Sequence, residues 1–133
     1  METLAVHAGS PVDPVGGAVV TPIFQSATFL SGGAENYEDV RYIRLNNTPN
    51  HQVLHARLAA LCGAEAALVC ASGMAAISTA LLTVLRAGDH LVAQNCLYGG
   101  TRALLERDAA ALGIRTTFVD GRDLDPWRGA IQG

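Results

Sequence analysis

The chain contains no lysine, and all nine of its basic residues are arginine. A chain without a side-chain amine cannot itself form a Schiff base with a carbonyl compound, and it cannot supply the phosphate-binding lysine of a P-loop. The arginines are spread from Arg41 to Arg128 without forming a basic stripe, and the net charge is −3. We therefore expect no nucleic-acid partner.

The sequence also lacks a leader segment with basic and apolar parts, and any run of the roughly 18 apolar residues that a bilayer crossing requires. These absences predict a cytoplasmic protein with no membrane partner. The three cysteines, Cys62, Cys70 and Cys96, are an odd number without Cys-x-x-Cys spacing. We expect buried free thiols in a reducing compartment, with Cys70 and Cys96 as core residues at strand ends.

Metal and nucleophile sites have little support. His51 and His55 stand four residues apart on an expected helix, but no third metal ligand lies at a diagnostic spacing. We expect these histidines to form a solvated helix face and the chain to bind no metal. No G-x-S-x-G nucleophile elbow occurs.

Residues 1–49 and 50–133 differ in composition. The first stretch is rich in proline, glycine, serine, threonine and asparagine, includes Pro11 and Pro14, and shows no sustained period. We predict an extended arm there, because so long an irregular stretch usually serves function or contact with another chain. Residues 24–29 within it could pair as a strand.

From residue 50 the pattern alternates helices with strands. Leu54, Leu58 and Leu61 recur at helical spacing and predict an amphipathic helix, while Asp125 and Pro126 resemble an N-cap with proline at the first helical position. The expected elements are helices over 50–62, 73–86 and 100–112, strands over 66–70, 90–93 and 115–119, and a helix beginning near 125. This order predicts an α/β fold with a parallel sheet covered by helices, which usually needs more than three strands.

The junction from Val69 to Met74 is the first candidate site. An expected strand turns there through Ser72 and Gly73 directly into a helix. Free N–H groups at the helix start, with the positive end of the macrodipole and no side chain on Gly73, suit a phosphate. The alternative is that Ser72 is only an N-cap and Gly73 only a tight turn.

Three further residues could complete such a site. Tyr98 follows the second expected strand, where open α/β sheets bind ligands, and its ring could stack on a planar cofactor. Tyr42 and Arg44 stand two apart in an extended segment, so both could bind one phosphate. The alternatives are a half-buried tyrosine, and a surface arginine beside an aromatic ring.

Several short motifs follow one another along nearly the whole chain. They are Val6-His7-Ala8-Gly9, Thr21-Pro22-Ile23-Phe24-Gln25-Ser26-Ala27-Thr28-Phe29, Tyr42-Ile43-Arg44, Gly63-Ala64-Glu65-Ala66, Ser72-Gly73-Met74-Ala75-Ala76-Ile77 and Tyr98-Gly99-Gly100-Thr101. In this order they resemble the Cys/Met-metabolism enzymes dependent on pyridoxal phosphate (PLP), a family that includes cystathionine γ-synthase, cystathionine β- and γ-lyases, methionine γ-lyase and O-acetylhomoserine sulfhydrylase.

The resemblance implies that residues 50–133 form the first part of the fold-type I PLP-dependent transferase large domain. By the same resemblance, Ser72 and the amides of Gly73 and Met74 would hold the cofactor phosphate. Tyr98 would stack on the pyridine ring and is a possible auxiliary in catalysis.

The resemblance also implies an oligomer. Tyr42 and Arg44 would reach the cofactor phosphate of a neighbouring subunit, so that residues 1–49 would lie across the partner's site rather than on their own core. This arrangement implies an obligatory dimer with a shared site, and the family usually assembles two such dimers into a homotetramer.

The chain departs from the family pattern at several places. It has Asn47-Thr48-Pro49 where the family has Asn-Pro-Thr, and Gly100 where methionine γ-lyases carry a cysteine, which disfavours that activity. The family's Schiff-base lysine, and its aspartate that pairs with the pyridine nitrogen, would lie beyond Gly133.

The implied function is β- or γ-elimination or γ-replacement on sulfur-containing or homoserine-derived amino acids, with the 133 residues inactive by themselves. One alternative is a catalytically inactive truncated homologue, or an assembly partner that lends its arm to a full-length subunit. Another is an α/β module that binds a phosphate-containing ligand. An incomplete sheet would leave an unpaired strand edge, so we expect the isolated chain to self-associate.

Overall fold

The computed structural model describes residues 2–10 and 15–131. Pro11 and Pro14 of the expected arm lie outside these residues. The chain divides into two compact units, Met1–Val69 and Cys70–Gly133. The expected division at residue 50, between an arm that contacts a neighbouring subunit and a cofactor domain, stays a prediction.

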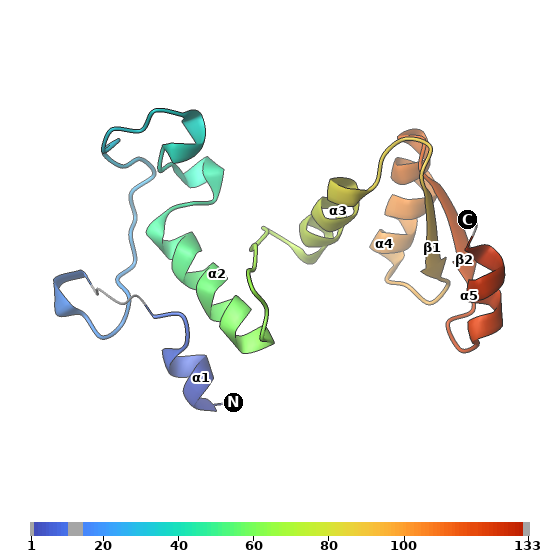
Figure 1. Ribbon diagram of the computed structural model, residues 1–133, viewed down its shortest axis with the longest axis horizontal. Helices are drawn as coiled ribbons and strands as arrows, with labels where there is room; N and C mark the ends of the chain where they lie inside the picture. Colours follow the sequence, from blue (N-terminus) through green and yellow to red (C-terminus); the bar gives the residue numbers. More distant parts are fainter. Residues whose placement is uncertain (1, 11–14, 132–133) are drawn as a thin grey trace. The chain divides into compact units, whose positions relative to one another are not determined.

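The first unit is built around helix α2 (Pro49–Cys62), which begins and ends close to the expected residues (Figure 1). Thr48 is its N-cap and Pro49 occupies the first turn, where proline's missing N–H is no loss. Gly63 ends the helix in the left-handed conformation, with φ 61°. The Thr48-Pro49 order therefore forms a common type of helix start, a threonine N-cap followed by proline in the first turn.

The stretch before α2 is not wholly extended. It contains the helix α1 (Glu2–His7) and the 3₁₀ turns η1 (Val15–Gly17), η2 (Tyr37–Asp39) and η3 (Ile43–Leu45). Residues 24–29 form no strand, and Thr28 makes a single antiparallel bridge to Tyr42. Irregular backbone of this kind needs partners other than a strand ladder for its polar groups.

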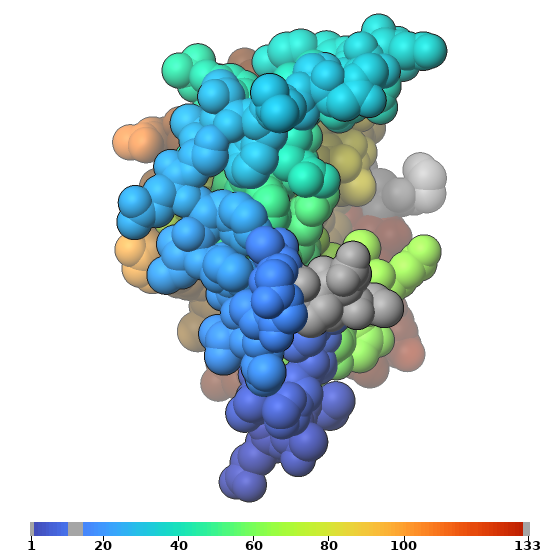
Figure 2. Space-filling model, turned by 90° about the vertical axis from the view of Figure 1, so that its left-hand side faces the viewer, coloured from blue at the N-terminus to red at the C-terminus, as the bar shows by residue number. Residues whose placement is uncertain are grey.

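Part of the stretch packs on its own α2. Helix α1 contacts α2, and Gly9 follows it with φ +67°. A Cβ on Gly9 would stand 2.5 Å from the backbone nitrogen of Arg57, so only glycine allows this approach. The space-filling view shows the chain before α2 (blue) beside α2 (green) (Figure 2).

Asparagine side chains supply many of the missing backbone partners. Asn47 accepts a hydrogen bond from the N–H of Tyr42 at 2.9 Å and donates one to the carbonyl of Val40 at 2.8 Å. Asn50 makes the same pair of bonds with both backbone groups of Phe24, at 3.1 and 2.7 Å. Two amides next to the start of α2 thus fix two separate stretches of irregular chain.

Helix α2 is present as predicted, but the predicted buried and exposed faces of the helix are wrong. Leu54, Leu58 and Leu61 are 45%, 38% and 37% exposed, so the leucine stripe does not pack in the unit's interior. The predicted solvated face is wrong as well: His51 Nδ1 lies 2.7 Å from the hydroxyl of the buried Thr48, and His55 Nε2 is buried. The stretch before the helix meets other residues of α2 instead, among them Val53, Ala56 and Arg57.

The second unit contains a parallel pair of strands, β1 (His90–Gln94) and β2 (Arg115–Val119), which confirms the predicted α/β class. Their register runs from His90 opposite Arg115 to Gln94 opposite Val119. The helical elements are α3 (Gly73–Val84), α4 (Gly99–Ala103), the π-helical segment η4 (Leu104–Ala109) and α5 (Leu124–Ala130). Figure 1 shows α4 and α5 on either side of the strand pair.

The core of this unit lies between the α4–η4 helix and β2. Leu105, Ala109, Ile114 and Val119 are all buried there. Gly113 turns the chain between helix and strand with φ +80°. Burial of these aliphatic side chains therefore holds the second unit together.

Four expectations for residues 66–131 need correction. Residues 66–70 form no strand, and the described strands β1 and β2 pair with each other. Helix α3 ends at Val84, where the guanidinium of Arg86 donates to the carbonyls of Leu82 and Thr83. The helix expected over 100–112 changes from α to π geometry, and α5 has Asp123 rather than Asp125 as its N-cap.

The cysteines are also less buried than predicted. Cys62 and Cys96 are exposed, and Cys70 is intermediate. Cys70 and Cys96 lie outside the strands, next to helix starts, so the reason for expecting core positions is absent. No helix in residues 2–10 or 15–131 combines the length and the apolar character of a membrane span.

Candidate functional site

The start of α3 has the geometry of an anion-binding site. Ser72 is in extended conformation, and its hydroxyl accepts the N–H of Ala75 at 3.1 Å. Within the described residues, the N–H groups of Gly73 and Met74 have no protein partner. A Cβ on Gly73 would meet nothing within 4 Å, so the space beside these amides is open. The N-cap alternative holds for Ser72, and it leaves the two amides available to a ligand.

Tyr98 stands at the start of α4, as its N-cap, and is 74% exposed. Its ring lies against Gly100: a Cβ on Gly100 would be 2.7 Å from Cε1 of the ring and 3.2 Å from Sδ of Met74. The missing side chain at Gly100 therefore lets the tyrosine ring and the Met74 thioether come close to the same backbone.

A further contact joins the two helix starts. The hydroxyl of Thr101, a residue only 9% exposed, lies 3.7 Å from the Met74 sulfur. Met74 thus offers its amide to the open first turn of α3 while its side chain packs against α4. The structure brings Ser72, Gly73, Met74 and Tyr98 together in one unit, and open amides beside an exposed ring fit a planar group that carries a phosphate.

Tyr42 and Arg44 belong to the first unit. The Arg44 guanidinium lies 5.3 Å from the centroid of the Tyr42 ring, so the two side chains do lie together. The expected reason is wrong, because Arg44 lies in the 3₁₀ turn η3 and only Tyr42 is extended. Their use at a neighbouring subunit's site stays a prediction.

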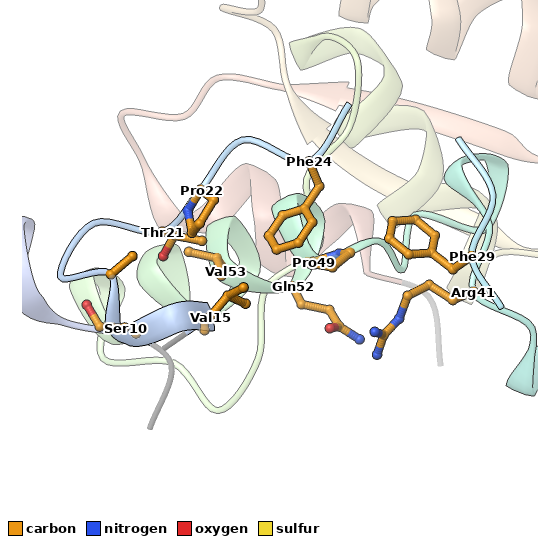
Figure 3. A pocket seen from close by; sticks show the side chains of 13 residues that line it. Ser10, Val15, Thr21, Pro22, Phe24, Phe29, Arg41, Pro49, Gln52 and Val53 are labelled. Carbon is orange, nitrogen blue, oxygen red and sulfur yellow. The ribbon is translucent and has the colours of Figure 1, made fainter. Parts of the chain in front are cut away.

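A cavity of about 570 Å³ lies in the first unit, between the stretch before α2 and α2 itself. Figure 3 shows Phe24 over the helix, with the side chains of Gln52 and Arg41 approaching one another at one end. Its lining is mostly apolar and includes none of the predicted site residues. We therefore place the candidate site at the starts of α3 and α4.

Arg102 and Glu106, on the helix that begins after Tyr98, were not predicted from the sequence to support this site. Arg102 pairs with Glu106 and also reaches the backbone of Asn95. The spacing of Arg102 and Glu106 could have indicated an ion pair on a helix. No sequence pattern links Arg102 to Asn95, because that contact depends on how the loop before α4 folds back.

Comparison with known proteins gives the family. The sequence profile described as "Cys/Met metabolism PLP-dependent enzyme" matches residues 2–133. A probable cystathionine γ-synthase of Herpetosiphon aurantiacus is 40% identical over 130 residues, which are 98% of this chain and 40% of that protein. An L-methionine γ-lyase of Fusobacterium nucleatum subsp. polymorphum is 42% identical over 138 residues, with 98% and 34% covered.

Solved structures agree with these relatives. Cystathionine γ-lyase from Lactobacillus plantarum, in complex with L-serine, superimposes with a TM-score of 0.86 at 34% identity, covering 98% of this chain and 34% of that one. The chain spans about 34–40% of the length of the relatives it matches. The likeness confirms the expected fold, the N-terminal part of the PLP-dependent α/β domain, and the chain belongs to the Cys/Met-metabolism family of PLP-dependent enzymes.

Proposed function

We propose that the second unit holds pyridoxal phosphate, in an enzyme that carries out β- or γ-elimination or γ-replacement on sulfur-containing or homoserine-derived amino acids. The observation that carries this proposal is the junction of α3 and α4. There, two open first-turn amides stand in the same unit as the exposed Tyr98 ring, and Met74 contacts both helix starts.

Each residue has a distinct part in binding. The N–H groups of Gly73 and Met74 donate to the phosphate, and the aligned peptide dipoles of the twelve-residue α3 favour its negative charge. Ser72 keeps the turn in shape by capping Ala75. Tyr98 stacks on the pyridine ring and orients it, and it is the candidate auxiliary in catalysis. When bound, the cofactor supplies an electron sink for carbanion chemistry.

The first unit serves the assembly in this proposal. Tyr42 and Arg44 bind the cofactor phosphate of a neighbouring subunit, as their stacked side chains allow. The site is then shared within a dimer, and two dimers form a homotetramer. The proposal keeps the cytoplasmic location that the sequence leads us to expect.

The amine that such chemistry needs is not among these 133 residues, because they contain no lysine. The residues therefore bind and orient the cofactor without completing the reaction by themselves. A second candidate function, an inactive homologue or assembly partner that lends its Tyr42 and Arg44 to a complete subunit, rests on the contact between these two side chains in the first unit. Relatives named as synthase, lyase and sulfhydrylase are similarly identical to the chain, so identity does not choose the substrate.

Two substitutions in the natural protein test the binding proposal. A branched side chain in Gly73→Val fills the open space beside the α3 amides, so we expect about tenfold weaker binding of pyridoxal phosphate and little change for pyridoxal. Tyr98→Ala removes the stacking ring and weakens both ligands. Equilibrium dialysis measures each affinity.

Gly129→Val is the matched control, since Gly129 in α5 also has nothing within 4 Å of a built Cβ. The control should bind both ligands as the unaltered protein does. Equal affinity of Gly73→Val and Gly129→Val for pyridoxal phosphate would overturn the proposal.

A further inference from the structure

The side chain of Arg102 joins the helix after Tyr98 to the loop before it and to β2. Its Nε lies 2.8 Å from Glu106 Oε1, and its Nη1 donates to the carbonyl of Asn95 at 3.2 Å. The same guanidinium lies 4.5 Å from the centroid of the Phe118 ring on β2. One planar group thus contacts three different elements.

The loop that Arg102 holds is the one that carries Tyr98. It leaves β1 after Gln94, and the N–H of Asn95 is bonded to the carbonyl of Val119 at 2.8 Å. At its other end, the carbonyl of Tyr98 accepts the backbone N–H of Arg102 at 3.0 Å. Arg102 therefore fixes the first carbonyl of the loop through its side chain and the last through its main chain.

Tyr98 needs such support because most of its surface is exposed. Its exposed fraction is 74%, and on one side the ring lies against Gly100, where a Cβ would stand 2.7 Å from Cε1 of the ring. A ring held from one side keeps its direction only if its backbone is fixed. The loop before α4 has no helix or strand bonds of its own beyond the two ends just described.

The contacts also suit arginine in particular. The ion pair with Glu106 is about half exposed, with side-chain exposures of 41% and 47%, so by itself it adds little stability. It fixes the plane of the guanidinium, which then stacks on Phe118 and points a second N–H at Asn95. A lysine has neither the plane nor the fork to make these contacts together.

We propose that Arg102 is a positioning residue: by locking the Asn95–Tyr98 loop to β2, it holds the Tyr98 ring in place beside the first turn of α3. This inference rests on the proposed function for its effect on the cofactor, because the ring that Arg102 positions is the proposed stacking partner. It predicts that Arg102 acts on cofactor binding only through Tyr98.

A double-mutant cycle in the natural protein tests this dependence. Arg102→Ala should weaken pyridoxal phosphate binding about fivefold and change the visible circular dichroism of the bound cofactor, which reports its orientation. Adding Arg102→Ala to Tyr98→Ala should change the affinity by less than about 1.5-fold, because the positioned ring is already gone. Arg102→Lys should recover part of the affinity, since it keeps the charge beside Glu106.

Arg107→Ala is the control, because Arg107 lies on the same helix, its side chain is 77% exposed, and its ion pair is with the neighbouring Asp108. It should leave affinity and dichroism unchanged. Equal losses from Arg102→Ala with and without Tyr98 would overturn the inference, and so would an affinity of Arg102→Ala within twofold of the unaltered protein. If Arg102→Ala does not fold, the same two comparisons are made with Arg102→Lys.

Hydrogen exchange without cofactor separates this inference from the proposed function. The amide of Asn95, which is bonded to the carbonyl of Val119, should exchange about tenfold faster in Arg102→Ala than in Arg107→Ala. If the unaltered protein binds no pyridoxal phosphate, the proposed function fails, while faster exchange would still support the positioning role. Unchanged exchange would overturn it whatever the cofactor does.

Discussion

The two units of the chain are held together in different ways. In the second unit, a parallel strand pair and the aliphatic side chains of Leu105 and Ile114, 3% and 2% exposed, form an ordinary small core. Among the described residues of the first unit, Ala59 and Thr48 are buried. Asparagine side chains bond its backbone groups, as neighbouring strands would in a sheet.

This difference means that the two units respond differently to substitution. A core of several aliphatic residues tolerates changes of similar volume, because its stability is distributed over many contacts. A segment fixed by one glycine and a few amides depends on the identity of each one. Single substitutions should therefore affect the first unit more strongly and more locally than the second.

Gly9→Ala should have the largest effect, because it is expected to place a Cβ against the backbone of Ala56 and Arg57. Gly16→Ala is the matched control, since Gly16 has a similar φ of +61° and open space around it. We expect Gly9→Ala to cost about 3 kcal/mol of local stability and Gly16→Ala about 1 kcal/mol. Native-state hydrogen exchange at the α2 amides measures both, and equal costs would show that α2 does not need the close approach.

Asn47→Ala is expected to have an intermediate effect. It removes the partner of both the Tyr42 N–H and the Val40 carbonyl, so it should cost about 1–3 kcal/mol in the first unit. Asn95→Ala in the second unit should cost below about 0.5 kcal/mol, because there the backbone of Asn95 makes the bonds. Exchange of the α2 and β1 amides compares the two variants. A loss from Asn95→Ala as large as that from Asn47→Ala would remove the distinction between the units.

The smallest effect concerns the end of β2, where a side-chain pair holds a turn of the second unit. The Arg122 guanidinium, and then its backbone N–H, lower the pKa of the Asp120 carboxyl below its usual range. The stabilisation is present above the usual carboxyl pKa and is lost as the pH falls through the lowered one. An NMR titration of Asp120 should show the low midpoint, and Arg122→Ala should raise it toward the usual value, with the backbone N–H of residue 122 keeping part of the lowering. Arg128→Ala, which affects the pair with Asp125, should not move it.

Much of the second unit could be predicted from the sequence because its elements have clear periods. The strand over 115–119 has the expected bounds, and β1 extends the expected strand by one residue. The failure at 66–70 has a physical cause: an apolar run is a strand only when another strand lies beside it. The first unit was less predictable because its bonds run from side chains to distant backbone, as between Asn50 and Phe24.

The candidate site divides in the same way. Ser72, Gly73 and Tyr98 could be predicted, since a cap, a small residue and a helix start are local features of sequence. The contact between Thr101 and Met74, and the reach of Arg102 to Asn95, depend on how two segments meet. No local pattern predicts such a meeting, although the residues involved decide how the site is held.

The π-helical segment η4 explains how one helix can serve both the site and the core. The buried residues of this helix, Thr101, Leu105 and Ala109, are spaced by four. In an α-helix, each step of four residues turns the side chain about 40° beyond a full circle, so such a row drifts around the helix. The wider turns of the π segment reverse this drift. The opposite drifts of the α and π turns thus keep Thr101 against Met74 while Leu105 and Ala109 stay in the core. A substitution that changed the π turns of η4 would rotate one end of the helix against the other. It would therefore move the side chains at the site although no site residue had been altered.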